Sequence, residues 1–519
     1  MYRLDANCML GPTNTNREPS FRTPDQLLEE MDRLRIGEAL VYSSLARMGD
    51  PVAGNRLLLN QIRDHPRLHA CWIVLPPGTS QQLPPGELVS QMKSLGVRAV
   101  RMFPGEHFFP LLERSLRPLL LALAEARIPL LIDTDRKSWA QLRLDWREIL
   151  ALAESHPQLP LVLLREGGST ARVLFALWDE VPNIHLDVSY LQQSSIVEEV
   201  CERFGAKRLL FGTNMPEYDP GGPLALLDGA LIDAEQRIQI GGNNLRGLLG
   251  LQPVSEEAPR RWPVGSDGFR VFDIHGHLGQ WNRMYHRDHT PRDLVMRMDQ
   301  LGVERLVISD LLGIGPDYRK GNDRVGRALA EFPDRLVGYS VYNPNYEYEM
   351  AAEMRRCFDD LGCSGIKLHC MLHDTSTEDS RYRLAFRVAE ERACPLLCHV
   401  HNGPSPEFLA DLLAEHPHLK FIYAHLGGGP RAGLEPLLPV AEARSNLFFD
   451  LAMSAMPRAT LAWLAGQVPP RQILYGSDYP IMDFSYQLGR VLHAQVPERV
   501  KKMILWSNAE SIFAPPIKQ

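Results

Sequence analysis

The sequence predicts an α/β fold made of two tandem (β/α) barrels of the TIM type, one in each half of the chain. The chain has 519 residues, which is more than one hydrophobic core usually organises, and its halves repeat one another at a spacing of about 265 residues. Each half alternates short apolar runs with amphipathic segments, as repeated βα units do. The alternative is an open doubly wound sheet. We disfavour it because polar residues recur at the ends of many different strands, where a barrel assembles its site.

The repeat is visible in motifs that keep one order along the chain. FDIHGHLG at 272–279 matches LDANCMLG at 4–11, and QILYGSDYP at 472–480 matches RLLFGTNMP at 208–216. Further matches between these two pairs keep nearly the same spacing, which chance similarity of apolar strands does not explain. We therefore predict a duplicated chain.

The duplication sets the expected domain boundaries. One barrel is predicted at 1–251 and the second at 269–519. The segment between them, 252–268, is rich in proline, glycine and charge, which is typical of a linker.

The second half shows its βα units most clearly. Amphipathic spacing predicts helices at 293–302 and 324–332. Short apolar runs, several of which end in a polar residue, predict strands. These runs are LVISD (306–310), LVGYSV (336–341), GIKLH (365–369), PLLCHV (395–400), FIYAH (421–425), LFFDLA (447–452) and ILYGSD (473–478).

Composition excludes several classes of protein. Hydrophobic residues make up 45% and charged residues 23%, and the formal net charge is −7, so there is no basic field for nucleic acid. The most apolar stretch, 119–132, is too short and too interrupted to cross a membrane, and the amino terminus lacks signal-peptide features. Eight cysteines without a CxxC pair indicate free thiols. We expect a cytoplasmic protein without a nucleic-acid or membrane partner.

Histidines are distributed unevenly, and several follow strands of the second half. His275 and His277 alternate on one strand, so both side chains point to the same face. A lone buried histidine is more often a satisfied core residue. Two imidazoles that share one face and are separated by a glycine are harder to explain as packing, because each needs a polar partner.

Other strand ends add further polar groups. His399 and His401 share a face of the fifth strand, His425 precedes three glycines, and Asp478 follows an apolar run. A buried carboxylate is costly unless it is paired or coordinates a cation. Imidazole and carboxylate ligands suit zinc, and they also bind manganese or iron. We therefore predict one divalent metal ion in the second half, zinc first, with Mn²⁺ or Fe²⁺ as alternatives.

These motifs resemble the amidohydrolase superfamily, in particular the amidohydrolase-related branch that includes aminocarboxymuconate semialdehyde decarboxylase. The resemblance rests on DIHGH (273–277), PLLCH (395–399), AHLGGG (424–429) and GSDYP (476–480). It implies that His275, His277 and Asp478 are metal ligands, together with a histidine of the fifth strand. His399 is favoured as that ligand, and His401 is the alternative.

The resemblance also implies chemistry. A metal ion lowers the pKa of a bound water toward about 7, Asp478 accepts the proton, and His425 acts as a catalytic histidine that steadies developing charge. The leading hypothesis is a hydrolase that attacks a C–N or C–O bond of a small molecule. The alternatives are a non-oxidative decarboxylase of an aromatic or unsaturated acid and a non-catalytic metal-binding protein.

Four further residues are candidates for substrate binding. Lys367 and His369 lie at the end of the strand 365–369, and Trp281 and Arg287 lie in the aromatic and cationic loop after the first strand. In binuclear relatives a lysine near this place is carbamylated and bridges two metals. The preferred interpretation here is a lysine that pairs with Asp478 or binds a substrate carboxylate.

In the first half every ligand position differs. The residues at the matching positions are Asn7, Met9, Asp133, Arg165 and Asn214, which cannot build a zinc site. The first half is therefore predicted to be a pseudoenzyme domain that pairs with the second half as a pseudo-dimer within the chain. Assembly of whole chains into a homo-oligomer is a further expectation. A sharper hypothesis is that Arg165 or Arg172 contributes to the active half.

Overall fold

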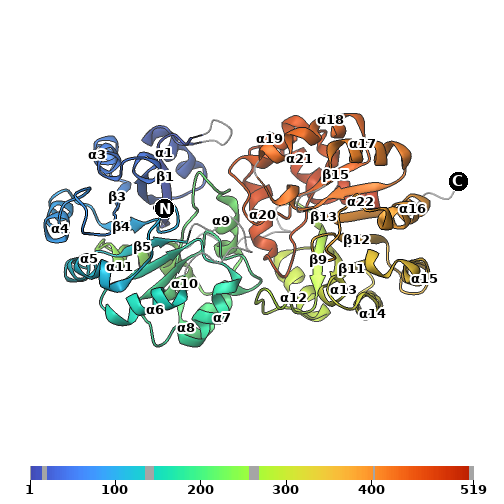
Figure 1. Ribbon diagram of the computed structural model, residues 1–519, viewed down its shortest axis with the longest axis horizontal. Helices are drawn as coiled ribbons and strands as arrows, with labels where there is room; N and C mark the ends of the chain where they lie inside the picture. The colour runs from blue at the N-terminus through green and yellow to red at the C-terminus, as the bar shows by residue number, and fades with distance from the viewer. Residues whose placement is uncertain are drawn as a thin grey trace. The chain divides into compact units, whose positions relative to one another are not determined.

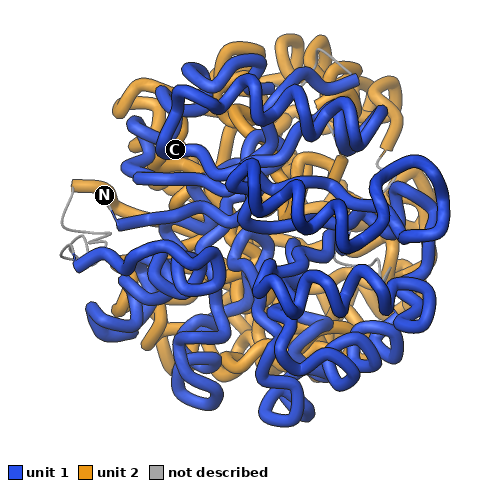
Figure 2. The backbone as a smooth tube through the Cα atoms, turned by 90° about the vertical axis from the view of Figure 1, so that its left-hand side faces the viewer, with its two compact units in different colours: residues 1–261 blue, residues 262–519 orange. Residues whose placement is uncertain are grey.

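The computed structural model describes residues 2–14, 20–134, 145–255, 268–400, 404–429 and 431–513. It divides into two compact units, residues 1–261 and 262–519, which Figure 2 shows in different colours. Most of the expected linker lies outside the described residues. No helix among the described residues is long and apolar enough to span a membrane.

The first unit is built on eight parallel strands, each hydrogen-bonded to the next in chain order (Figure 1). The backbone N–H of Ala6 donates to the Phe211 carbonyl at 2.9 Å, and that of Met9 donates to the Met215 carbonyl at 2.8 Å. These bonds join the first strand to the chain at and after the last strand, so the sheet closes into a barrel. The strands are β1 (Leu4–Leu10), β2 (Glu38–Ser43), β3 (Leu68–Ile73), β4 (Ala99–Met102), β5 (Leu130–Asp133), β6 (Leu161–Leu164), β7 (Ile184–Asp187) and β8 (Leu209–Leu210).

At least one helix follows each strand of this barrel. They are α1 (Pro24–Arg33), α2 (Ser44–Met48), α3 (Pro51–Ile62), α4 (Pro85–Ser94), α5 (Glu113–Ala126), α6 (Trp146–Ser155), α7 (Gly168–Leu177), α8 (Ile196–Phe204), η1 (Ala206–Arg208), α9 (Gly221–Gly229), α10 (Ala234–Ile238), η2 (Gln239–Asn243) and α11 (Asn244–Leu248).

The second unit repeats this plan. The Ile274 N–H donates to the Tyr475 carbonyl at 3.0 Å, and the His277 N–H donates to the Tyr479 carbonyl at 2.7 Å, which closes the second barrel. Two tandem TIM-type barrels, as predicted, are therefore confirmed. The strands are β9 (Phe272–Leu278), β10 (Arg305–Asp310), β11 (Leu336–Val341), β12 (Gly365–His369), β13 (Pro395–His399), β14 (Lys420–Tyr423), β15 (Leu447–Asp450) and β16 (Ile473–Leu474).

Both segments predicted from amphipathic spacing are helical in the second unit, as α12 and α14, and each prediction runs one residue past the end of its helix. The α-helices are α12 (Pro291–Leu301), α13 (Leu311–Ile314), α14 (Tyr318–Glu331), α15 (Glu347–Asp359), α16 (Arg383–Glu391), α17 (Pro406–Glu415), α18 (Leu438–Ala443), α19 (Thr460–Gln467), α20 (Phe484–His493), α21 (Glu498–Lys502) and α22 (Asn508–Phe513). The short 3₁₀ and π segments are η3 (Pro344–Tyr346), η4 (Ser380–Tyr382), η5 (Ala424–Gly428), η6 (Arg431–Gly433), η7 (Glu435–Leu437), η8 (Pro470–Gln472) and η9 (Met503–Ser507).

Local signals in the sequence account for the limits of these elements. Thr290 and Asp293 form a capping box that starts α12, and Gly302 ends it in the left-handed conformation. All seven residues of β9 are buried, as expected for a barrel strand that is covered on both faces.

The duplication extends to individual hydrogen bonds. The Asn183 side chain donates to the carbonyls of three residues before β6, and Asn446 makes the same set of bonds before β14. Arg67 donates to two backbone carbonyls before β2 and pairs with Asp32. Arg335 does the same before β10 with Asp299 as its partner. Residues that share these bonds give an alignment of the two barrels that does not depend on motif similarity.

Candidate metal centre

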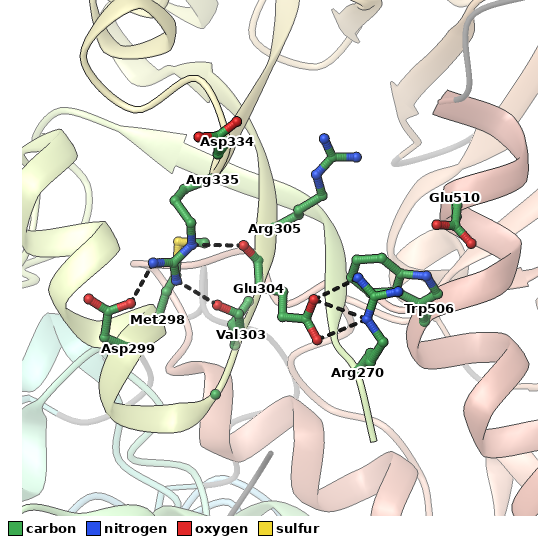
Figure 3. A pocket seen from close by; sticks show the side chains of 11 residues that line it. Arg270, Met298, Asp299, Val303, Glu304, Arg305, Asp334, Arg335, Trp506 and Glu510 are labelled. Atoms are coloured by element: carbon green, nitrogen blue, oxygen red, sulfur yellow. Dashed lines mark hydrogen bonds and ion pairs between the residues drawn. The ribbon is translucent and has the colours of Figure 1, made fainter. Parts of the chain in front are cut away.

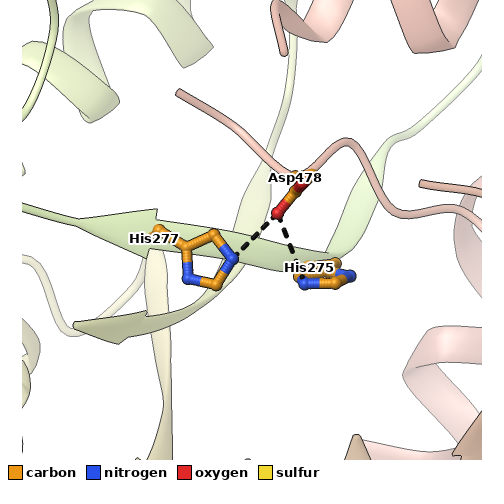
Figure 4. A group of neighbouring side chains, drawn as sticks. All are labelled: His275, His277 and Asp478. Atoms are coloured by element: carbon orange, nitrogen blue, oxygen red, sulfur yellow. Dashed lines mark hydrogen bonds and ion pairs between the residues drawn. The ribbon is translucent and has the colours of Figure 1, made fainter. Parts of the chain in front are cut away.

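Three side chains converge at the carboxyl end of the second barrel. His275 and His277 belong to β9, and Asp478 follows β16 (Figure 4). Asp478 Oδ1 lies 2.8 Å from His277 Nε2 and 3.5 Å from His275 Nε2. Both histidines are almost completely buried, so these polar groups face one another and not solvent.

Two glycines make room for this arrangement. A Cβ on Gly276, between the two histidines, would lie 2.6 Å from a methyl carbon of Leu306. A Cβ on Gly476, two residues before Asp478, would lie 2.1 Å from Asp450 Oδ1 and 2.8 Å from the Cβ of His275. Glycine is therefore required at both places by close packing.

Neighbouring groups fix the orientation of both β9 imidazoles. The Nδ1–H of His275 donates to Asp450 Oδ2 at 2.7 Å, and Asp450 is fully buried at the end of β15. The Nδ1 of His277 lies 2.9 Å from the Ser309 hydroxyl oxygen, which accepts the Nδ1 proton in the tautomer that leaves Nε2 free to ligate. Both rings therefore turn Nε2 toward Asp478, which is how a partner behind a ligating histidine orients it.

Three more histidines lie beside this cluster. His425 donates from Nδ1 to the Ala452 carbonyl at 2.6 Å and accepts at Nε2 from His399 Nδ1 at 2.9 Å. The centre of its ring is 4.7 Å from that of His275. His369 stacks on His399 with 3.9 Å between ring centres.

Lys367 reaches the same point from β12. Its ammonium group donates to His275 Nε2 at 2.9 Å, and the residue is fully buried. Burial lowers the pKa of Lys367 to about 8, although nearby Asp478 and Asp450 oppose the shift. Lys367 is the third of the five residues of β12, and its role in substrate binding stays a prediction.

The electrostatics favour neutral imidazoles and an ionised carboxylate. Burial lowers the pKa of His275 well below its ordinary value, with a contribution from the Lys367 charge, and burial lowers that of His425 to about 4. Burial also lowers the pKa of His277, against the effect of its hydrogen bond to Asp478. For Asp478 burial acts to raise the pKa, but the hydrogen bond from His277 and the nearby positive charges outweigh it, so the pKa is lowered. Neutral imidazole and ionised carboxylate are the ligating forms of these side chains.

The donor set fits a divalent metal ion. The donor atoms of His275, His277 and Asp478 all lie within 4.8 Å of one another. Two ligands of a tetrahedral zinc ion lie about 3.4 Å apart, because each bond measures about 2.0–2.2 Å. The 3.5 Å between His275 Nε2 and Asp478 Oδ1 matches this spacing. A second grouping, of His275, His425 and Asp450, shares His275, but there Asp450 already accepts a hydrogen bond from the imidazole.

The structure thus brings together most of the residues singled out in the sequence. Those seven are His275, His277, Lys367, His369, His399, His425 and Asp478. His401, the alternative ligand, lies outside the described residues. Trp281 forms an isolated bridge with Met284 and Arg287 is exposed, so their role in substrate binding stays a prediction.

Sequence reasoning missed Asp450 and Ser309. A signal for Asp450 was present, because Asp187 ends the matching strand of the first barrel, and a carboxylate kept in both copies at a strand end marks a buried network. Ser309 matches Tyr42 in the first barrel, so the repeat carried no signal for it.

A closed ion network fills the matching place in the first barrel. Arg101, which matches Lys367, and Arg165, which matches His425, both pair with Asp133, and Arg101 also donates to Asn7 Oδ1 at 2.7 Å. Burial raises the pKa of Asp133, but the two guanidinium charges outweigh it and hold the pKa below its ordinary range. The donor groupings that could hold a metal, among the described residues, lie in the second barrel.

Backbone geometry is nevertheless the same in both barrels. His425 and Asp478 have φ values of 56° and 66°, and Arg165 and Asn214, at the matching positions, have 61° and 57°. Such left-handed conformations are unusual for residues with a side chain and often occur at functional sites. Since the first barrel keeps them without the ligands, they belong to the inherited barrel end and not to metal binding.

The profile of the amidohydrolase family matches residues 23–251 and 272–514. A search of curated proteins found no match. Similar solved structures include a putative amidohydrolase from Staphylococcus aureus, with 18% identity over 47% of this chain and 99% of that chain and a TM-score of 0.39. They also include 5-carboxyvanillate decarboxylase from Sphingomonas paucimobilis, with 16% identity, 47% and 99% coverage and a TM-score of 0.36. A third is 4-oxalomesaconate hydratase from Rhodopseudomonas palustris, with 18% identity, 47% and 95% coverage and a TM-score of 0.37.

Proposed function

Because this chain belongs to the amidohydrolase family, we propose that its second barrel is a metal-dependent hydrolase that acts on a C–N or C–O bond of a small molecule. The observation that carries the proposal is the convergence of two imidazole nitrogens and one carboxylate oxygen within 4.8 Å. His275, His277 and Asp478 would hold the ion, with His399 as a further ligand from β13. The first barrel then serves as a metal-free pseudoenzyme domain.

When bound, a divalent ion supplies Lewis acidity, which makes the proton of a water available near neutral pH. Asp478 is the proton acceptor in this account. Its lowered pKa keeps it ionised at neutral pH, and its carboxylate lies at the point on which both β9 imidazoles converge.

His425 has a more specific role than its motif alone implies. Its Nδ1–H donates a hydrogen bond to the Ala452 carbonyl, so Nε2 carries no proton and acts as an acceptor. This nitrogen accepts from His399 Nδ1 at 2.9 Å, so it orients His399 and does not donate to a developing oxyanion. Lys367 is the better donor for that charge, because its ammonium group lies next to His275.

Lys367 also favours a second candidate function, the non-oxidative decarboxylation of a small aromatic or unsaturated acid. A buried ammonium group beside the ligand cluster suits the carboxylate of such a substrate. The two reactions differ in product, since hydrolysis forms a new carboxylic acid together with an alcohol or an amine, and decarboxylation releases CO₂.

A substrate screen tests the proposal. The zinc-loaded chain would be assayed against lactones, amides and aromatic acids, with acid release and CO₂ release followed separately. Acid release that is lost in Asp478→Asn supports the hydrolase, and CO₂ release supports the decarboxylase. If the wild type and Asp478→Asn both bind metal and neither turns over any substrate, the chain would instead be a non-catalytic metal-binding protein.

A further inference from the structure

A groove lies at the amino-terminal end of the second barrel, where β10 begins. It consists of two adjoining pockets of about 530 Å³ and about 480 Å³, the larger of which is drawn in Figure 3. Arg305, the first residue of β10, and Glu510, on α22, line both pockets. Each volume lies within the range typical of small-molecule sites. The metal centre is at the opposite, carboxyl end of the strands, so the groove is separate from it.

Arg305, Glu510 and Asp334 differ from the other charged residues of the groove, and of these three Asp334 lines the larger pocket alone. Arg270 pairs with Glu304, and Arg335 pairs with Asp299, as the dashed lines in Figure 3 show. The Arg305 and Glu510 side chains form no hydrogen bond or ion pair with the part of the chain that the structure describes. The Arg305 guanidinium is half-buried and lies over the ring of Phe272, at 5.5 Å from its centre.

In the first barrel an ion pair closes the position that matches this groove. Glu38 stands opposite Leu4 in the sheet as Arg305 stands opposite Phe272. Arg246 follows the structurally matched Asn244 by two residues, as Glu510 follows Asn508. In the first barrel these two positions carry the opposite charges, and Glu38 and Arg246 form an ion pair.

Two more side chains fill the first barrel at this end. His69 Nε2 lies 2.6 Å from Glu38 Oε2, and Arg98 donates to the Leu249 carbonyl at 3.1 Å. The matching residues of the second barrel are the much shorter Val337 and Ser364, and both line the 480 Å³ pocket. The second barrel therefore has an open pocket where the first has a closed ion pair and two long polar side chains.

The open pocket has a definite chemical character. The cation of Arg305 and the anion of Glu510 lie where the two pockets adjoin, and most of the other residues that line the smaller pocket are apolar. The apolar lining consists of Leu329, Pro333, Leu336, Val337 and Phe513. A bare carboxylate would meet Glu510 as a like charge, and a bare amine would meet Arg305 in the same way.

We propose that this groove binds a free α-amino acid with an apolar side chain. Its carboxylate pairs with Arg305 in the bidentate geometry that guanidinium favours, and its ammonium group pairs with Glu510. Its side chain enters the apolar pocket and leaves water. A zwitterion satisfies both charges at once, which neither an anion nor a cation does.

Isothermal titration calorimetry on the full zinc-loaded chain tests the ligand class. L-phenylalanine is the probe, and 3-phenylpropionate, 2-phenylethylamine and glycine each lack one of its three recognised groups. We expect each control compound to bind about tenfold more weakly or worse, since each loses a charged contact or the apolar burial. No heat with L-phenylalanine at millimolar concentration, or equal binding of 3-phenylpropionate, would overturn the proposal.

Variants that copy residues of the first barrel into the second locate the site. Ser364→Arg introduces the side chain that fills this place in the first barrel, and the double change Arg305→Glu with Glu510→Arg restores its ion pair. Both are expected to weaken L-phenylalanine binding at least about tenfold while the circular dichroism melting curve stays that of a folded chain. The matched control, Glu38→Arg with Arg246→Glu in the first barrel, should bind as the wild type does. Unchanged binding in folded Ser364→Arg would contradict the proposal.

Discussion

Asp450 accepts a hydrogen bond from His275 Nδ1 at 2.7 Å and so turns His275 Nε2 toward Asp478. The same carboxylate also accepts from the backbone N–H groups of His425 at 3.2 Å and Ala452 at 3.0 Å. One buried residue therefore connects the strand that carries two proposed ligands with the strand ends that carry His425 and Ala452.

Asp450→Asn is expected to weaken zinc binding by about 10- to 100-fold, because the amide holds the imidazole less firmly and lowers its basicity. Competition titration with a chromophoric chelator measures the change. Asp187→Asn, at the matching position of the first barrel, is the control and should leave zinc affinity unchanged. Equal effects of the two substitutions would show that Asp450 acts only through fold stability.

The first barrel should depend on its ion network for stability. Asp133→Asn leaves two buried guanidinium groups without their shared counter-charge, so we expect a loss of about 3–5 kcal/mol in the free energy of unfolding of the first barrel. Urea denaturation followed by circular dichroism measures it. Asp145→Asn removes an exposed pair with Arg147 and should stay close to wild type. An Asp133→Asn chain as stable as wild type would refute the role of this network.

Zinc binding should persist to unusually low pH. The pKa values of His275 and His277 are lowered by burial, so their neutral, ligating forms survive below the ordinary imidazole value of about 6.5. Asp478 has a lowered pKa and stays ionised over the same range. We therefore expect zinc release, followed against pH with a chelating dye, to have its midpoint below pH 6.5. A midpoint above that value would contradict the assigned burial effects.

Lys367 separates metal binding from catalysis. Lys367→Met removes a cation that lies 2.9 Å from His275 Nε2, so zinc should bind at least as tightly as in the wild type. Turnover of the substrate found in the screen should fall about 100-fold or more, because the donor for developing negative charge is lost. The two quantities to measure are the zinc affinity and the kcat of Lys367→Met, each compared with the wild type. Loss of zinc together with activity would assign Lys367 to the ligand sphere instead.

Much of the fold follows from the repeat and from periodicity. The apolar runs that end in His369, His399 and Asp450 became β12, β13 and β15, because burial on both faces gives a barrel strand a continuous apolar sequence. The closing bonds at His277 could not be predicted, since they depend on how far the sheet curves around a barrel.

The candidate site was predictable where residue type was informative. His275, His277 and Asp478 stood out because imidazoles and a carboxylate at strand ends need partners. Ser309 did not, because a serine is common at strand ends and its bond to His277 depends on strand register. The opposed charges of Arg305 and Glu510 could not be predicted to form a site either. The reversal of charge relative to the first barrel is seen only when the two barrels are aligned by their shared hydrogen bonds.

Mass spectrometry of the metal content of protein purified without chelator and supplied with zinc shows directly whether the second barrel holds a metal ion. We expect one equivalent of zinc per chain in the wild type. We also expect loss of that equivalent in His275→Asn, which gives the second barrel the residue that the first barrel has at Asn7. No zinc in the wild type, or zinc retained in full by folded His275→Asn, would contradict a metal centre built on β9 of the second barrel.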